Sequence, residues 1–517
     1  MNPAGGFAPG TADAWRPRYS PWLIGLVVTM ATFMEVLDTS VANVALPHIA
    51  GNLSASVDEA TWVLTSYLVS NAIILPLSGW FSALIGRKRY YRICVLLFTL
   101  SSLLCGLAPN LGLLVFFRIL QGIGGGGLQP SEQAILVDTY PPEKRSMGMA
   151  LYGVAVVCAP IIGPTLGGWI TDNYSWRWIF LINIPVGILS LILTSFMLED
   201  PPYMIRKKLG PNFRVDYIGL GLLALGLGAL QLMLDKGERE DWFSSNFIIG
   251  CAVVAAVALL AAAVYEWRHK DPVVDLHLLK DRNFLLATVT LFMLGFVLYG
   301  STVLLPLFLQ TLMGYTALLA GMALSPGGFM TMLLMPLVGF LLTRYQPRWL
   351  IMLGLAIAGM SMFYMTGFTL GIDFETAVLS RVFLAGGLAF LFVPINTAAF
   401  SFIPREKVNH GTGLINLARN IGGSVGIANV VTLLARRAQF HQNVLVSHLT
   451  PFDAGYRQFL EQARQFLASF GGDPVQAAAR AQALVYGLVQ RQAAMLAFID
   501  DFWLLGVTCL AIIPLLL

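Results

Sequence analysis

Apolar runs long enough to cross a lipid bilayer recur along the whole chain, and no other feature constrains the fold as strongly. A membrane-spanning helix needs about 20 apolar residues. Of the 517 residues, 57% are hydrophobic and 12% are charged, whereas a soluble domain carries about 25% charged residues. The sequence therefore predicts an all-α polytopic membrane protein rather than a series of soluble domains.

Fourteen such runs can be placed on the chain. They are residues 22–46, 59–82, 90–108, 111–137, 147–170, 177–198, 215–234, 246–267, 284–311, 319–342, 349–370, 378–402, 410–435 and 500–517. Because the number of crossings is even, we expect both termini on the same side of the membrane.

Lysine and arginine indicate which side that is. When the N-terminal tail is assigned to the cytoplasm, the cytoplasmic segments contain 20 of these residues and the six short loops on the opposite face contain 3. Such an excess is typical of cytoplasmic loops. We therefore expect both termini in the cytoplasm, and the net charge of +4 reflects topology rather than nucleic-acid binding.

Cysteine and histidine give no sign of a metal site or of disulfides. The five cysteines lie within apolar runs, and the six histidines are scattered without the spacing of metal ligands. A membrane enzyme would need a nucleophile with a base, or a metal cluster, at one face of the membrane, and the sequence has no such constellation. We therefore do not expect an enzyme.

An internal repeat divides the chain. "FMEVLDTSVANVALP" at 33–47 matches "FMLGFVLYGSTVLLP" at 292–306, and three further matches have offsets between 258 and 263 residues. An even number of crossings separates equivalent helices, so the repeat is parallel, as in transporters whose substrate site lies between the halves. The predicted domains are a cytoplasmic tail (1–21), an N-terminal six-helix half (22–198), a linker (199–283) with an inserted helix pair (215–234 and 246–267), and a C-terminal six-helix half (284–517) that includes a periplasmic loop (436–499).

The loop 436–499 has a composition of its own. It contains six arginines among many glutamines and alanines, as in "YRQFLEQARQFLASF". This pattern predicts short amphipathic helices outside the membrane. They form either a solvated cap or a docking surface for a partner.

Two carboxylates in the first span have no equivalent in the second half. Glu35 aligns with Leu294 and Asp38 with Val297. Ionised groups are costly inside a membrane and are usually functional. The second half keeps the helix without them, so packing does not require the two acids.

Depth in the membrane predicts a partner for Asp38. Asp38 lies about eight residues from the outer end of its span and Arg118 about seven from the outer end of the fourth span, which places them at similar depth. We expect the two to be close. Glu35 lies one turn deeper with no base beside it, and burial should favour its protonated form. The proton-coupling candidates are Asp38, which we favour, Glu35, Arg118 and Glu132. Glu132, near the inner end of the fourth span, could instead act as a local cap or pair locally.

Polar and aromatic residues that recur on helix faces are candidates for a central cavity. The fourth span has a polar stripe that lipid would penalise. Arg381 and Arg419 could bind substrate or contact backbone carbonyls. The candidate cavity residues are Phe33, Gln121, Gln129, Tyr152, Phe292, Phe296, Tyr299, Asn396, Asn416 and Arg419.

Five motifs together resemble one family. They are "LDTSVANVALP" (37–47), "GWFSALIGRKR" (79–89), "RILQGIGGGGLQP" (118–130), "GVAVVCAPIIGPTLGG" (153–168) and "WRWIFLINIPVG" (176–187). In these motifs the chain resembles the major facilitator superfamily, specifically its fourteen-helix drug:proton antiporters of the EmrB/QacA type. The resemblance implies alternating access and export of hydrophobic drugs from a bacterial cell across the inner membrane, driven by the proton motive force without a cofactor.

The resemblance also implies partners and conformational motifs. The loop 436–499 is similar to that of the EmrB branch, which implies a periplasmic adaptor of the EmrA type and an outer-membrane channel. In the first cytoplasmic loop, Ala83 and Leu84 stand where the family has Asp and Arg. The residues that match the conformational motifs are Gly79, Gly86, Arg87, Lys88, Pro160, Gly163, Pro164, Gly167 and Gly168.

Two other transport functions remain open. The superfamily contains symporters, so proton-coupled uptake of a small nutrient is one alternative. Export of an endogenous metabolite or lipid is the other.

Overall fold

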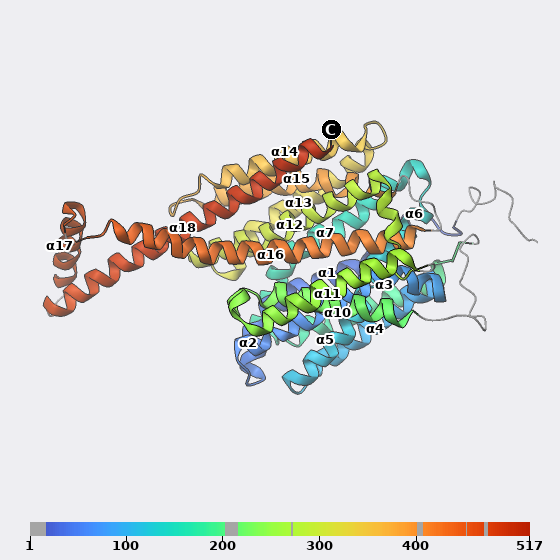
Figure 1. The fold of residues 1–517 in the computed structure, drawn as a ribbon, viewed down its shortest axis with the longest axis horizontal. Coiled ribbons are helices and arrows are strands. Elements are labelled where there is room, and N and C mark those ends of the chain that lie inside the picture. Colours follow the sequence, from blue (N-terminus) through green and yellow to red (C-terminus); the bar gives the residue numbers. More distant parts are fainter. Residues whose placement is uncertain are drawn as a thin grey trace, which may run out of the picture.

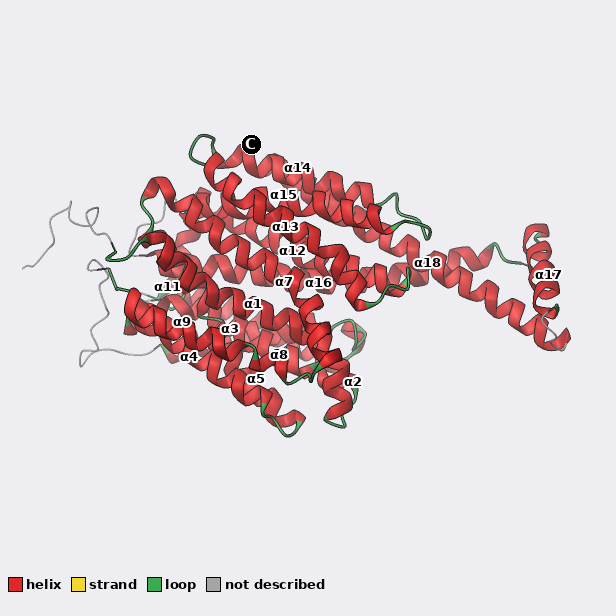
Figure 2. Ribbon diagram, turned by 180° about the vertical axis from the view of Figure 1, so that it is seen from behind, coloured by secondary structure: helices red, strands yellow, loops and turns green. Residues whose placement is uncertain are grey.

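The computed structural model describes residues 17–201, 216–269, 272–400, 407–450, 452–469 and 474–516. This part of the chain is helical throughout and contains no strand. The helices run nearly parallel in one long bundle, from which α16, α17 and α18 project at one end (Figures 1 and 2). The all-α fold predicted from the apolar runs is confirmed.

The N-terminal half consists of α1 (Pro21–Asn52), α2 (Val57–Ala60), α3 (Trp62–Ile85), α4 (Arg87–Gly106), α5 (Leu111–Gly125), α6 (Leu128–Thr139), α7 (Arg145–Asn173), α8 (Trp178–Leu181) and α9 (Asn183–Met197). The inserted pair is α10 (Tyr217–Lys236) and α11 (Asn246–Arg268). The C-terminal half consists of α12 (Arg282–Thr311), α13 (Ala317–Leu341), α14 (Pro347–Met365), α15 (Phe374–Phe400), α16 (Val408–Ser447), α17 (Ala454–Ala468) and α18 (Pro474–Ile512). Short 3-10 turns lie at Pro142–Lys144, Trp242–Ser244, Leu276–Lys280 and Ile513–Leu516.

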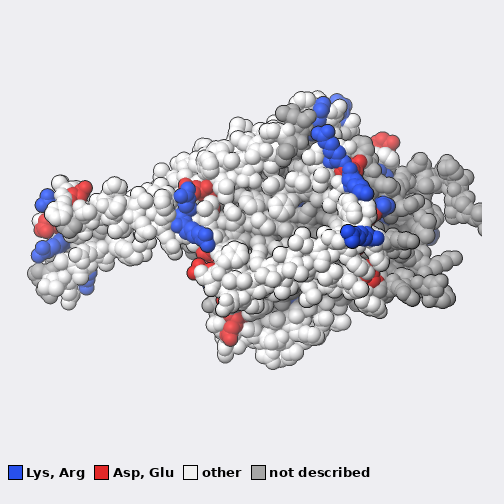
Figure 3. Space-filling model, in the orientation of Figure 1, with Lys and Arg blue, Asp and Glu red and all other residues white. Residues whose placement is uncertain are grey.

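Thirteen candidate spans in the described residues are long and apolar enough to cross a membrane. The remaining predicted span corresponds to α4. This helix begins with basic residues, "RKRYYR", which lower its mean hydropathy, but it packs in the bundle against α5 and α9. On the face in Figure 3, charged side chains lie at the two ends of the bundle and on the projection, and the belt between the ends has none.

The bundle has a basic end and a distal end. The basic end is where α1 begins and where Arg87, Lys144 and Lys407 lie. The distal end is the opposite one, from which α16 and α18 project (Figure 1).

The fourth predicted span, 111–137, is broken in the structure. It consists of α5 and α6, and the helix is interrupted at Gly126 and Gly127. A Cβ atom at Gly126 would lie 2.7 Å from the Asn71 backbone oxygen, and one at Gly127 would lie 2.4 Å from Cys94 Sγ. Glycine at both positions lets α5 and α6 contact α3 and α4 closely.

The last span and the loop 436–499 also differ from the prediction. α16 has 40 residues and α18 has 39, so both continue as helices far beyond the predicted span ends at 435 and 500. Only α17, with 15 residues, is a separate short helix of the predicted kind. The two long helices pack along each other and carry α17 at their tip (Figure 1).

Four helix pairs connect the two halves. α7 packs along α13, and α3 packs against α16. Smaller contacts join α15 to α7 and α6 to α16. The inserted helix α10 packs against both α3 and α16. This arrangement leaves the centre of the bundle lined by α1, α3, α7, α12 and α16.

Candidate functional site

A cavity of about 220 Å³ lies between the two halves. Its wall on α1 runs from Glu35 to Asn43, which extends from the middle of the helix toward the distal end. Of the candidate cavity residues, Gln129, Tyr299, Asn416 and Arg419 line it. The rest of the wall is mixed. Its apolar side chains include Val36, Leu64, Leu68, Leu75, Val303 and Ile427, and its polar ones include Thr39, Ser40, Asn43, Tyr67, Asn71, Arg118, Thr302, Asn420 and Ser424.

The other candidate cavity residues lie outside this wall. Gln121 is buried beside Asp38, and Tyr152 is buried behind Gln129. Asn396 accepts a hydrogen bond from Gln133. Phe33 packs in the apolar cluster at the distal end of the N-terminal half, and Phe292 and Phe296 approach Gly422 and Gly426 of α16 with their backbones.

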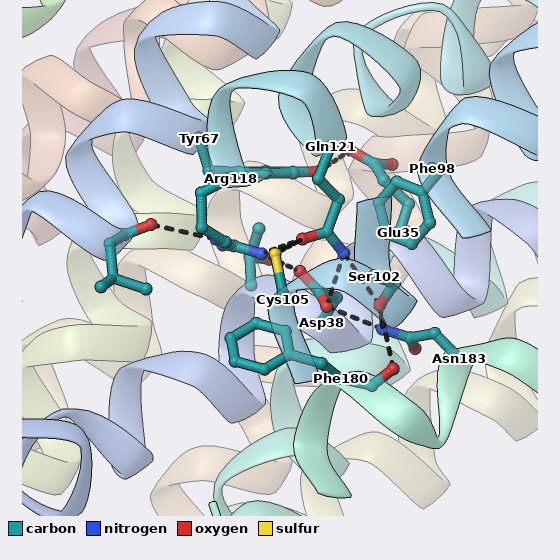
Figure 4. Close-up of polar contacts among 12 residues, drawn as sticks. Glu35, Asp38, Tyr67, Phe98, Ser102, Cys105, Arg118, Gln121, Phe180 and Asn183 are labelled. Atoms are coloured by element: carbon teal, nitrogen blue, oxygen red, sulfur yellow. Dashed lines mark hydrogen bonds and ion pairs between the residues drawn. The ribbon is translucent and has the colours of Figure 1, made fainter. Parts of the chain in front are cut away.

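Asp38 is fully enclosed by polar partners (Figure 4). Arg118 Nη1 lies 2.5 Å from Asp38 Oδ2, and both side chains are completely buried. Gln121 Nε2 and Asn183 Nδ2 donate to Asp38 Oδ1 at 3.0 and 2.7 Å. The predicted contact between Asp38 and Arg118 is therefore confirmed, but Asp38 does not line the cavity.

Arg118 is held from several sides, which makes this ion pair a rigid unit. Its Nε donates to the Val63 backbone oxygen at 3.0 Å, and the guanidinium lies 4.3 Å from the centre of the Tyr67 ring. Ser102 accepts hydrogen bonds from both Gln121 and Asn183. The hydrogen bonds of Arg118 Nε and Nη1 lower the cost of burying the pair, whereas Nη2 has no hydrogen-bond partner among the described residues.

Glu35 is the carboxylate that reaches the cavity. Gln129 Nε2 donates to its Oε2 at 2.7 Å, and Tyr67 and Asn71 donate to its Oε1, each at 3.2 Å. Within the described residues Glu35 has no ion-pair partner, as the sequence predicted. The cation nearest in this network, Arg419, bonds to Gln129 rather than to Glu35, so the direct hydrogen-bond partners of Glu35 are neutral groups.

Arg419 connects the C-terminal half to Glu35 through one intermediate side chain. It donates to Gln129 Oε1, and its Nη1 donates to the Tyr152 hydroxyl at 3.1 Å. Gln129 therefore bonds Glu35 of α1 with its amide nitrogen and Arg419 of α16 with its oxygen. This chain of hydrogen bonds joins the two halves across the cavity.

Glu132 lies outside the cavity, nearer the basic end. It is fully buried on α6 and accepts a hydrogen bond from Thr29 Oγ1 at 2.7 Å. Both residues belong to the N-terminal half, so this contact is local.

The two halves are in contact at the basic end. Asn416 Nδ2 donates to Gln133 Oε1 at 2.6 Å, and Ser146 Oγ donates to the Gly339 backbone oxygen at 2.8 Å. A Cβ atom at Gly79 would lie 2.8 Å from the Asn409 backbone oxygen. Glu35 and the cavity lie on the distal side of these contacts.

The motif after α3 forms a charged contact inside the N-terminal half despite its two departures. Arg87 Nη1 pairs with Asp138, and it donates to the Ala134 backbone oxygen at 3.0 Å. Lys88 Nζ donates to the Ser195 backbone oxygen at 2.9 Å. Gly86, with φ of 91°, provides the left-handed turn between α3 and α4. These contacts tie α4 to α6 and α9.

The motif on α7 lets α1 and α7 lie close together. A Cβ atom at Gly163 would lie 2.4 Å from Ser40 Oγ, and one at Gly167 would lie 2.9 Å from a Val41 methyl group. Ser40 Oγ also donates to the Pro160 backbone oxygen at 3.1 Å. Pro164 lies in the same continuous helix, and Gly168 is close only to Val44, at 4.0 Å.

Sequence reasoning missed several partners of the two acids. Tyr67, Asn71 and Asn183 all bond to Glu35 or Asp38 from other helices. Each is a polar residue inside an apolar span, and that signal was available in the sequence. A polar residue in an apolar span does not by itself indicate which helix face it occupies. The partners of Glu35 and Asp38 could therefore not be predicted from this signal.

Comparison with known proteins agrees with the motifs. A family model described as Major Facilitator Superfamily matches residues 28–427. The chain is 38% identical to the "Probable multidrug resistance protein EmrY" of Escherichia coli (strain K12) over 87% of each chain. It is 40% identical to the "Fatty acid resistance protein FarB" of Neisseria gonorrhoeae over 86% of this chain and 85% of that protein, and 37% identical to the "Multidrug export protein EmrB" of Escherichia coli (strain K12) over 85% of each.

Solved structures share the fold at low sequence identity. The human organic anion transporter MFSD10 aligns with a TM-score of 0.57 and 13% identity, over 95% of this chain and 100% of that one. The proton:xylose symporter XylE aligns with a TM-score of 0.56 and 15% identity, over 93% and 99% of the two chains. The chain belongs to the Major Facilitator Superfamily, and its relatives there include the multidrug exporter EmrB.

Proposed function

We propose that this protein exports hydrophobic small molecules across the bacterial inner membrane in exchange for protons, by alternating access between its two halves. The observation that carries this proposal is Glu35, a carboxyl in the cavity wall whose hydrogen-bond partners are all neutral. The relatives named as multidrug resistance and export proteins support the export of drugs. The basic end is assigned to the cytoplasm because lysine and arginine gather in its loops.

In this assignment the structure represents a state closed toward the cytoplasm. The halves meet at the basic end, and the cavity lies between Glu35 and the distal, periplasmic side. A proton arriving from the periplasm reaches Glu35 by way of this cavity. The return to the cytoplasm-facing state requires the contacts at the basic end to open.

The hydrogen bonds around Gln129 couple the protonation of Glu35 to the C-terminal half. A bond from Gln129 to an ionised carboxylate is stronger than one to a neutral acid. Protonation of Glu35 therefore loosens Gln129, which is also the acceptor for Arg419. The link between the halves weakens as the charge disappears, and the halves become free to move.

The available energy is sufficient for export. A single charge that crosses a potential of 100 mV releases about 2.3 kcal/mol. This free energy supports a concentration gradient of roughly fifty-fold for a neutral substrate.

We assign the projecting helices to a periplasmic partner. They extend beyond the bundle on the side opposite the basic end, and α17 at their tip exposes Phe459 and Phe466. A periplasmic adaptor of the EmrA type, with an outer-membrane channel, is the partner that this arrangement suits.

The proposal is tested in inside-out membrane vesicles that carry an imposed pH gradient, acid inside. A substrate of a proton antiporter should dissipate this gradient when it is added outside, because its uptake into the vesicle releases protons. The Glu35→Gln protein should not dissipate the gradient. If the substrate leaves the gradient unchanged with the natural protein, or if uptake consumes external protons as in a symporter, the proposal is wrong.

A further inference from the structure

Arg381 is a buried cation whose charge is not matched by a partner. It lies on α15 and is 1% exposed. Among the residues that the structure describes, its Nε and Nη1 atoms have no hydrogen-bond partner, and its Nη2 lies 3.4 Å from the Thr302 hydroxyl. A buried charge without a counter-ion is strongly unfavourable, so a residue of this kind requires an explanation.

The internal repeat supplies a reason for the missing partner. Arg381 is the repeat equivalent of Arg118, at an offset of 263 residues. Arg118 pairs with Asp38, but the equivalent of Asp38 in the second half is Val297, which is buried and apolar. The C-terminal half has thus kept the cation and has no acid at the matching position.

Arg381 lies directly behind the wall of the central cavity. Thr302, the residue that it contacts, lines this cavity. The wall of the same half also contains the apolar side chains of Val303 and Ile427, and its lining cation, Arg419, donates hydrogen bonds to the neutral side chains of Gln129 and Tyr152. A cavity with apolar side chains in its wall and an uncompensated cation behind Thr302 is complementary to an amphipathic anion.

We propose that Arg381 is the head-group subsite for amphipathic carboxylates, which it binds through its guanidinium while the apolar side chains of the wall hold the tail. This inference rests on the proposed export function and names its substrate class. A carboxylate accepts two parallel hydrogen bonds from adjacent donors of a guanidinium. Nη1 of Arg381, with the second hydrogen of Nη2, forms such a pair. Glu35 is held by other side chains, so the anion and the proton do not compete for the same atoms.

Binding of three probes with the same tail tests the subsite. Dodecanoate, dodecanol and dodecyltrimethylammonium are titrated by calorimetry into the purified full-length protein in lipid nanodiscs. Arg381→Gln should weaken dodecanoate binding at least about tenfold, as expected for the loss of a charge-assisted bond, and should change dodecanol binding by less than about twofold. Equal weakening of all three probes, or unchanged dodecanoate binding, would overturn the proposal.

A second pair of variants keeps Arg381 in place. Thr302→Asp puts a carboxylate beside the guanidinium and should weaken dodecanoate binding at least about tenfold relative to Thr302→Asn, which has the same shape but no charge. If both variants bind dodecanoate equally, Arg381 is not the subsite. This pair gives an answer even if Arg381→Gln fails to fold.

Thermal stability separates a binding role from a structural one. Arg381→Gln removes a charge that has no counter-ion, so the melting temperature of the empty protein should stay level or rise. The matched variant Arg118→Gln leaves Asp38 unpaired and should lower it. A fall of equal size in both variants would mean that Arg381 has a structural partner, which contradicts the proposal.

The failure of this inference is distinguishable from failure of the export function. If dodecanoate binding does not depend on Arg381 while drugs still dissipate a pH gradient, the subsite is wrong and antiport stands. If dodecanoate binding depends on Arg381 but no substrate dissipates the gradient, antiport is wrong and the subsite stands.

Discussion

At the scale of single residues, two carboxyls only three positions apart in α1 have different environments. Asp38 is enclosed by Arg118, Gln121 and Asn183, whereas Glu35 lies in the cavity wall with neutral partners. A proton can reach Glu35 without disturbing an ion pair. The structure therefore favours Glu35 as the proton carrier and Asp38 as the residue that neutralises Arg118.

The Asp38→Asn variant should lose stability as well as transport. Removing one member of a buried ion pair costs about 3–5 kcal/mol, because Arg118 is left without a counter-ion. Adding Arg118→Gln to this variant should recover much of the loss, since no isolated charge then remains. Melting temperatures of the two variants in detergent test this, and an Asp38→Asn protein as stable as the natural one would contradict it.

The sequence was informative about single residues where distance along a helix decides the geometry. Equal depth was enough to predict the contact between Asp38 and Arg118. The sequence favoured Asp38 over Glu35 as the proton carrier, whereas their environments in the structure favour Glu35. That difference depends on Gln129 and Asn183, which come from other helices. Which of these side chains reaches which acid is decided by the rotation of each helix in the bundle.

At the scale of elements, hydropathy predicted the positions of the spans better than the ends of the helices. A fall in hydropathy indicates where the membrane ends, but a helix continues until glycine, proline or a cap interrupts it. The segment "LARRAQFHQNVLVS" in α16 contains neither glycine nor proline, so the helix extends past the predicted end at 435. The opposite occurs at Gly126 and Gly127, where the helix is interrupted inside a single predicted span.

The contact of α3 with α16 at the basic end should be sensitive to side-chain size. Gly79→Leu places a side chain against the Asn409 backbone, so the halves should not close at this end. A cysteine at Asn43, in a cysteine-free background, reports on access from the distal side because Asn43 lines the cavity. In Gly79→Leu this cysteine should react about tenfold more slowly with a membrane-impermeant maleimide. That change corresponds to a shift of about 1.4 kcal/mol in the equilibrium, away from the state that is open at the distal end.

Gly51→Leu is the matched control for this measurement. Gly51 also lies in a membrane helix, but a Cβ atom there would have no neighbour within 4 Å. Labelling of the cysteine at position 43 should be unchanged in this variant. Faster labelling in Gly79→Leu than in the control would mean that the contact does not hold the basic end closed.

At the scale of the whole molecule, two six-helix halves and an inserted pair form the transporting unit, and the projection is an addition to it. The root of the projection is fixed by Asp500, which pairs with Arg437 and His441. The family resemblance and the repeat both predict the two halves. The long helical form of the projection could not be predicted from hydropathy, because its outer residues are mostly polar.

Shortening the projection should preserve transport across the inner membrane but abolish drug resistance of whole cells. Replacing residues 445–483 by a short glycine-serine turn retains the contact of Gln442 with Tyr486 and the root at Asp500. Transport into inside-out vesicles should remain within about twofold of the natural protein, since the shortened part contains no cavity residue. Drug resistance of cells that express the adaptor should fall to the level of cells without the pump, and full resistance would show that the projection is not the docking surface.

The most direct test of the account concerns the proton on Glu35. Glu35→Gln keeps an oxygen that can accept hydrogen bonds from Tyr67 and Asn71 but cannot exchange a proton, so it should retain substrate exchange and lose proton coupling. In proteoliposomes with a pH dye inside, substrate counterflow of Glu35→Gln should stay within about threefold of the natural protein, and substrate-driven proton flux should disappear. Proton flux at the natural rate in Glu35→Gln would contradict the central claim.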